Sequence, residues 1–202
     1  MRKLQYLSFP ELLAPFGLFL MLMQLFIALP LKAETWRYAM EESLTDIQGV
    51  YARHFKNIIE KNSDHKVLIY PFGTLGESTD ILEQAQAGLL QFVDQSPGFT
   101  GTLIPEAQVF LLPYVLPEEH SEIAYFFKNS ETIHKTFYKL YGEQDLTLLT
   151  MFPEGNVAIT TREVFRSKED LSGMKIRVMS SPLLIETYKA FGAVPTPTAR
   201  SL

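Results

Sequence analysis

The sequence predicts an α/β protein in which strands alternate with helices and pair into mixed, mostly parallel sheets. Short apolar or aromatic segments are followed by amphipathic helical patterns, and this alternation recurs along the chain. The segments have the spacing of crossover units, which place successive strands side by side and parallel. The chain has 202 residues, of which 47% are hydrophobic, so it can bury a core and disorder is excluded as its main state.

The first half of the alternation consists of three strands separated by two helices. The helix that begins at Ile47 is indicated by apolar side chains at offsets of three and four as far as Ile59. In order, we expect a strand at residues 35–40, a helix at 47–61, a strand at 67–70, a helix at 78–88 and a strand at 90–94. Residues 105–117 contain three prolines among bulky apolar side chains, which argues against a regular helix. We predict a buried, extended connection there, with Phe110, Leu111, Leu112 and Tyr114 directed inward.

The second half continues with helices and strands in a less regular order. We expect helices at residues 118–127 and 131–141, strands at 146–152, 156–161 and 175–179, and a helix at 181–191. Gly192 follows the last of these helices and is a natural left-handed stop.

Residues 1–33 have the three-part pattern of a secretory signal peptide. Arg2 and Lys3 give a positive start, a long apolar stretch follows, and Ala33 is a suitable last residue before cleavage. An uncleaved membrane anchor is the alternative, because the apolar stretch is about long enough to span a bilayer. Both interpretations place the rest of the chain outside the cytoplasm, and we expect a periplasmic protein.

The charge and the residue types exclude several functional classes. The net charge is −5 and no basic run occurs, which argues against a nucleic-acid partner. Cysteine is absent, and the four histidines are not at metal-ligand spacing. No nucleophile elbow, phosphate loop or dinucleotide fingerprint is present, so we assign no catalytic residue, no metal and no cofactor. The acidic pairs Glu41–Glu42 and Glu118–Glu119 are interpreted as solvated.

Arg177 is unusual because it lies in the middle of a predicted strand. Strand alternation places Ile176 and Val178 on one face, and Lys175, Arg177 and Met179 on the other. A guanidinium there must reach solvent or find an anion, since burying it alone is costly. Its planar fork suits a carboxylate. An internally paired or solvated arginine remains the alternative on the residues alone.

The order of segments resembles the substrate-binding proteins of TRAP (tripartite ATP-independent periplasmic) transporters, of the DctP class. Residues 67–76 (VLIYPFGTLG) and 80–88 (DILEQAQAG) resemble the family's strand, Leu-Gly loop and Glu-Gln helix. Residues 106–116 resemble its apolar segment with Leu-Pro-Tyr. Residues 169–178 (EDLSGMKIRV) and 191–197 (FGAVPTP) resemble its Asp-Leu-x-Gly-x-Lys-Ile-Arg signature and its Gly-Ala-x-Pro-x-Pro turn. The likeness covers essentially the whole chain after the signal.

The resemblance implies a two-lobed, periplasmic-binding-protein-like clamp that closes on a small organic acid and passes it to the membrane permease subunits of a TRAP transporter. The arginine of the signature, which maps onto Arg177, would grip the ligand carboxylate. Glu77, after the Leu-Gly loop, and Ser96, at the end of the third strand, are second candidates, with capping and turn roles as alternatives. Pro195 would shape a nearby loop.

The sequence departs from the family pattern in two ways. Where many relatives have a second arginine, this chain has Val157, so we expect a simple monocarboxylate as ligand, with Asn156 supplying a neutral hydrogen bond. The chain also ends earlier than the family usually does, which predicts a C-terminally truncated form that binds ligand weakly. We expect a signal peptide at residues 1–33, lobe I at 34–153 and an incomplete lobe II at 154–202.

Two other functions are kept as alternatives. A clamp of the same type could serve an ATP-driven importer or a sensor system. An exported hydrolase is less favoured, since the sequence shows no nucleophile–base pair or metal cluster.

Overall fold

The structure is a computed structural model that describes residues 33–198. The chain divides into two compact units, Met1–Glu34 and Thr35–Leu202, and the elements below all belong to the second. The predicted signal peptide therefore lies outside the described residues, apart from Ala33. Between residues 33 and 198, no helix has the length and apolar character needed to cross a membrane.

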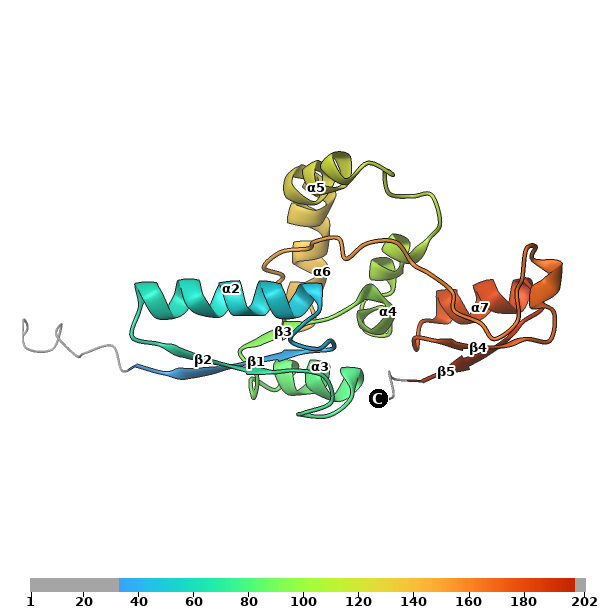
Figure 1. The fold of residues 1–202 in the computed structure, drawn as a ribbon. Coiled ribbons are helices and arrows are strands. Elements are labelled where there is room, and N and C mark those ends of the chain that lie inside the picture. The colour runs from blue at the N-terminus through green and yellow to red at the C-terminus, as the bar shows by residue number, and fades with distance from the viewer. Residues whose placement is uncertain (1–32, 199–202) are drawn as a thin grey trace, which may run out of the picture. The chain divides into compact units, whose positions relative to one another are not determined.

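The first sheet has three parallel strands in the order β2-β1-β3. They are β1 (Thr35–Met40), β2 (Lys66–Tyr70) and β3 (Phe92–Asp94), each within two residues of its predicted bounds. Helix α2 (Ile47–Asn62) connects β1 to β2, and helix α3 (Ser78–Gln86) connects β2 to β3. Figure 1 shows α2 on one face of the sheet and α3 on the other. The predicted alternation of strands and helices, with the strands paired in parallel, is confirmed.

Strand alternation in β1 divides the core between the two faces of this sheet. Tyr38 and Met40 pack with Ala52 of α2 and Val67 of β2, and aromatic side chains surround this cluster. Ala39 points to the other face, where it packs in a second cluster beneath α3. The central strand is therefore buried on both sides, as expected of a parallel sheet covered by helices.

The buried side of α2 agrees only in part with the predicted apolar stripe. The fully buried residues of this helix are Gln48, Gly49 and Ala52, whereas Ile47 and Ile58 are more than half exposed. Small side chains allow close packing: a Cβ on Gly49 would lie 2.4 Å from the backbone of Leu44. The periodicity predicted the helix correctly, and Phe55 and Ile59 of the predicted stripe pack against the core, whereas Ile47 and Ile58 remain largely exposed.

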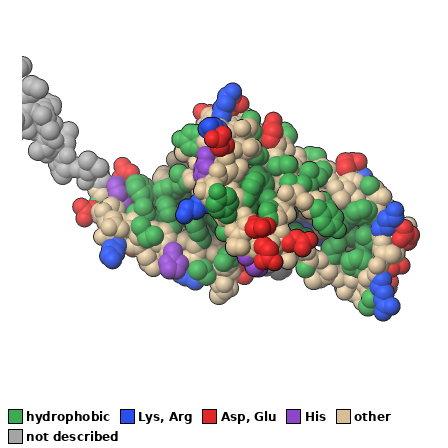
Figure 2. Space-filling view, turned by 90° about the horizontal axis from the view of Figure 1, so that it is seen from above, with side chains coloured by type: hydrophobic (Ala, Val, Ile, Leu, Met, Phe, Trp, Pro, Cys, Tyr) green, Lys and Arg blue, Asp and Glu red, His purple; other side chains and the backbone are tan. Residues whose placement is uncertain are grey.

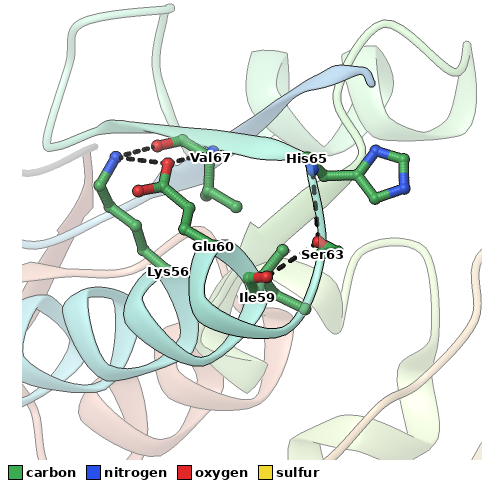
Figure 3. Close-up of polar contacts among 6 residues, drawn as sticks. All are labelled: Lys56, Ile59, Glu60, Ser63, His65 and Val67. Atoms are coloured by element: carbon green, nitrogen blue, oxygen red, sulfur yellow. Dashed lines mark hydrogen bonds and ion pairs between the residues drawn. The ribbon is translucent and has the colours of Figure 1, made fainter. Parts of the chain in front are cut away.

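The outer edge of β2 is covered by two side chains from α2 (Figure 3). Val67 donates its N–H to the Glu60 carboxylate at 2.9 Å, and its carbonyl accepts from the Lys56 ammonium at 2.5 Å. Lys56 and Glu60 also form an ion pair at 3.1 Å. An exposed strand edge is a template for unwanted pairing, so these contacts protect the sheet as well as hold α2 to it.

Residues 97–142 are helical and form a second core. They comprise α4 (Pro97–Thr100), the 3₁₀ helix η1 (Pro105–Leu111), α5 (His120–Asn129), the π-helix η2 (Thr132–Phe137) and α6 (Tyr138–Gly142). The helices predicted at 118–127 and 131–141 are confirmed. The extended connection predicted at 105–117 is wrong, because Pro105 begins the 3₁₀ helix, where a missing N–H does no harm. Phe110 packs inward, but Tyr114 is 96% exposed.

The strands predicted at residues 146–152 and 156–161 are absent from the described structure. Residues 146–161 have no regular secondary structure, and Leu149 and Val157 are largely exposed. A strand requires a neighbouring strand for its hydrogen bonds, and an apolar pattern does not supply one. Figure 2 shows hydrophobic side chains at many points of the surface on the face that it draws.

The second sheet consists of two parallel strands, β4 (Lys175–Val178) and β5 (Val194–Pro197), joined by helix α7 (Pro182–Ala190). A short 3₁₀ helix, η3 (Glu169–Leu171), precedes β4. The sheet has its own hydrophobic cluster, which includes Leu171, Ile176 and Val178. The loop predicted around Pro195 is wrong, since Pro195 lies in β5 opposite Ile176.

The side chain of Gln108, in η1, fastens the start of α7 to the rest of the unit. Its Oε1 accepts from the Ser181 hydroxyl at 2.7 Å and from the Leu183 N–H at 3.0 Å. Ser181 is fully buried and caps α7 by accepting the N–H of Leu184. This connection joins η1 to the helix that links β4 with β5.

Candidate ligand-binding site

A cavity of about 2410 Å³ lies within the second compact unit. Its lining comes from the carboxyl end of β3, the start of α4, residues 110–120, residues 145–163 and strand β4. Ligands of α/β proteins characteristically bind beyond the carboxyl ends of parallel strands. The volume exceeds that of a typical pocket for a small molecule, so the cavity is a wide, open cleft.

Arg177 lines this cavity from the exposed face of β4. Ile176 and Val178 are buried on the opposite face, as strand alternation predicted. Among residues 33–198, the Arg177 guanidinium forms no hydrogen bond and no ion pair. One alternative considered from the sequence was that Arg177 pairs with an acidic side chain of the protein. No such pair is found in the described structure.

Ser96 also lines the cavity, at the start of α4. Its hydroxyl accepts the N–H of Gly98 at 3.3 Å, and its own N–H donates to the Glu41 carboxylate at 3.0 Å. The same hydroxyl lies 3.4 Å from the sulfur of Met179, just beyond β4. Ser96 therefore has the capping role considered from the sequence, at a point where the first sheet approaches the segment after β4.

Asn156 and Glu77 differ in their positions. Asn156 is exposed and lines the cavity from the irregular segment at residues 146–161. Glu77 is the N-cap of α3, where its N–H donates to the Asp80 carboxylate at 2.8 Å in a capping box. Glu77 is not among the residues that line the cavity. The structure brings Arg177, Ser96 and Asn156 to one cavity and gives Glu77 a capping function.

Two acidic residues that sequence analysis did not single out have buried carboxyl groups near the cavity. The prediction that Glu41 is solvated is wrong: in the described structure its Oε1 is buried and has no hydrogen-bond partner. Burial raises the pKa of Glu41 to about 8, although the Ser96 N–H and the Ser78 hydroxyl favour its charged form. Glu41 directly follows β1, so its position at the end of a parallel strand was the signal available in the sequence.

Asp94, the last residue of β3, lines the cavity itself. Burial raises its pKa to about 6, and a hydrogen bond with Tyr38 opposes that shift. Its Oδ2 is buried and, among the described residues, has no partner. Burial, followed by the charge of Asp94, raises the pKa of Glu154, which lines the cavity from the irregular segment.

Within residues 33–198, the cavity is therefore lined by an unpartnered arginine on β4, by the Asp94 carboxyl group at the end of β3, and by Glu154 on the irregular segment. Such an arrangement can hold a small polar molecule by its charges without changing its bonds. Among the described residues, no group of three or more His, Asp or Glu side chains has the arrangement of a metal site.

Comparison with known proteins identifies the family. The family described as bacterial extracellular solute-binding protein, family 7 (DctP), matches residues 38–201. The chain belongs to this family. The DctP resemblance predicted from residues 67–88, 169–178 and 191–197 is thereby confirmed. The DctP match spans both sheets and every described element after the first residues of β1.

Characterised DctP proteins with high identity to the chain are ectoine-binding proteins by name. The ectoine/5-hydroxyectoine-binding periplasmic protein UehA of Ruegeria pomeroyi is 61% identical over 166 residues, covering 82% of this chain and 49% of UehA. The ectoine-binding periplasmic protein TeaA of Halomonas elongata is 54% identical over 165 residues, covering 82% of this chain and 48% of TeaA. The chain thus spans about half the length of these relatives.

Solved structures of DctP proteins confirm the fold class. The structure of the periplasmic ectoine-binding protein from the TeaABC TRAP transporter of Halomonas elongata matches with a TM-score of 0.79 at 55% identity, covering 82% of this chain and 53% of that one. The likeness therefore includes the α/β architecture of a TRAP periplasmic binding protein, over about half of its length.

Proposed function

We propose that the chain is a periplasmic solute-binding protein that captures a small organic acid and delivers it to the membrane subunits of a TRAP-type secondary transporter. The observation that carries this proposal is Arg177, which lines the cavity and has no partner within residues 33–198. Membership of the DctP family supports the same function. We propose no enzymatic step, because a site of this kind binds and releases its ligand unchanged.

Arg177 is suited to a carboxylate for reasons of geometry and charge. The guanidinium presents parallel N–H donors that match both oxygens of a carboxylate, and charge-assisted bonds of this kind are stronger than neutral ones. Strand β4 is held by its ladder to β5 and by the cluster beneath it, so the arginine is presented from a rigid base. The backbone that carries this cation is therefore in place before an anion binds.

We propose ectoine, or an acid of similar size, as the ligand to test first. The names of UehA and TeaA support this choice, at 61% and 54% identity. Ectoine has a single carboxylate, which agrees with the monocarboxylate expected from Val157. Ser96 and Asn156 are proposed as hydrogen-bonding partners of the ligand because both line the cavity. The division into lobe I at residues 34–153 and lobe II at 154–202 remains part of this proposal.

The test is a titration of the purified chain with ectoine by saturation-transfer NMR, which also detects the weak binding predicted from the sequence. We expect Arg177→Ala to weaken binding about tenfold to a hundredfold, which corresponds to one charge-assisted hydrogen-bonded pair. Arg37→Ala is the matched control, since Arg37 is an exposed arginine on β1 that does not line the cavity. If Arg177→Ala binds ectoine as well as the unmodified chain does, the carboxylate contact is assigned incorrectly.

A further inference from the structure

Met179 differs from the other methionines that the structure describes. The other three, Met40, Met151 and Met174, pack in hydrophobic clusters. Within residues 33–198, Met179 belongs to no such cluster; it directly follows β4, is half-buried and lines the cavity. We propose that Met179 is a site of reversible oxidation, at which a peroxide converts the thioether to a sulfoxide and so destabilises the contact between α4 and the segment after β4.

The Met179 sulfur lies against the first turn of α4. The Ser96 hydroxyl donates to this sulfur at 3.4 Å and accepts the N–H of Gly98 at 3.3 Å. Gly98 is buried, and a Cβ at that position would overlap the sulfur and the methyl carbon of Met179. The thioether therefore fills the space that a side chain on residue 98 would need. An additional atom on this side of the sulfur would displace either Met179 or α4.

Oxidation adds such an atom to the sulfur. Hydrogen peroxide supplies the oxygen: its O–O bond breaks, an S–O bond forms, the sulfur loses two electrons and the peroxide is reduced to water. A methionine sulfoxide reductase reverses the step, since it removes the oxygen as water while two thiols are oxidised to a disulfide. The sulfoxide is larger and more polar than the thioether, so it fits poorly against the packed backbone of Gly98.

The loss of this contact would also affect the proposed binding site. Arg177 precedes Met179 by two residues, and both side chains line the cavity. Without the contact to α4, the arginine is less firmly placed relative to the first sheet, and the ligand binds more weakly. The bonds from Gln108 to Ser181 and Leu183 remain, so we expect a local change and not global unfolding. This consequence for the ligand rests on the proposed function.

The experiment compares two proteins that differ only at Met179. Both carry Met151→Leu and Met174→Leu, because Met151 and Met174 also line the cavity, and the second protein carries Met179→Leu in addition. Leucine replaces methionine at nearly constant volume, so little stability is lost. Each protein is treated with hydrogen peroxide, and the sulfoxide at residue 179 is quantified by mass spectrometry of peptides. Thermal unfolding and the dissociation constant for ectoine, by saturation-transfer NMR, are measured before and after treatment.

We expect peroxide to lower the unfolding midpoint of the first protein by at least about 2 °C, and to raise its dissociation constant for ectoine about fivefold or more. Treatment with methionine sulfoxide reductases should restore both values. The protein with Met179→Leu should show neither change. Met179→Gln places an amide oxygen where the sulfoxide oxygen would lie, so it should reproduce both effects without peroxide.

Two results would overturn the oxidation site. One is an unfolding midpoint that stays the same when Met179 is fully oxidised, and the other is a Met179 that stays unoxidised under conditions in which free methionine reacts completely. A lower midpoint with an unchanged dissociation constant supports the oxidation site and overturns its link to the ligand. If the untreated chain does not bind ectoine, the proposed function is overturned, and the unfolding midpoints still decide the oxidation site.

Discussion

Replacement of Glu41 by glutamine should remove a large pH dependence from the stability of the protein. Burial raises the pKa of Glu41 from 4.5 to about 8. The folded state therefore holds a proton that the unfolded state releases at lower pH, and the free energy of unfolding falls as the pH rises from the unfolded pKa to the folded one. Each unit of pKa difference corresponds to about 1.4 kcal/mol, so the total is about 5 kcal/mol.

Glutamine has nearly the same shape and keeps an oxygen that can accept the Ser96 N–H, but it does not titrate. Glu41→Gln should therefore gain stability relative to the unmodified chain as the pH rises, by about 4 kcal/mol between about pH 5 and about pH 8. Asp94 and Glu154 also have raised pKa values, but they titrate in both proteins and largely cancel in the difference. The effect of Glu41 is therefore read from the difference between the free energies of unfolding of Glu41→Gln and of the unmodified chain at each pH.

The measurement is urea unfolding followed by circular dichroism at a series of pH values. Glu118→Gln serves as the control, because its carboxylate is exposed and the variant should follow the unmodified chain at every pH. Parallel stability curves for Glu41→Gln and the unmodified chain would refute the reasoning. Such a result would mean that the Glu41 carboxyl group is as well solvated in the folded chain as in the unfolded one.

Two further substitutions test the packing that positions the site. Gly49→Ala should destabilise the protein by more than about 1 kcal/mol in urea unfolding, despite the higher helix propensity of alanine, because the new Cβ would lie 2.4 Å from the Leu44 backbone. Gly142→Ala is its control and should be neutral or stabilising, since nothing lies within 4 Å of that position. Gln108→Leu should cost about 1–3 kcal/mol, because it leaves the buried Ser181 hydroxyl without its acceptor. Gln108→Glu keeps an acceptor oxygen, so its free energy of unfolding should fall by less than that of Gln108→Leu. Equal destabilisation by both variants would contradict the role of Gln108 as the acceptor for Ser181.

The local pattern of apolar and polar residues was sufficient to predict the strands and helices that pair or pack with segments nearby in the chain. The strands of the first sheet are separated by one helix each, so their parallel pairing follows from chain geometry. It was not sufficient for residues 146–161, where the apolar pattern of strands is present but the described structure provides no pairing strand. Within α2 the pattern indicated the helix and part of its contact face, Phe55 and Ile59, but not the buried Gly49 and Ala52, whose small size permits close packing.

The family and the face of β4 that carries Arg177 could be predicted without coordinates, because alternation along a strand is a local property that needs no knowledge of distant residues. The burial of the Glu41 and Asp94 carboxyl groups near one cavity, by contrast, became evident from the three-dimensional fold. Glu41 and Asp94 are adjacent because β1 and β3 pair, and their raised pKa values come from the side chains packed around them. Burial depends on contacts between residues far apart in the chain, so it cannot be predicted from the spacing of residue types.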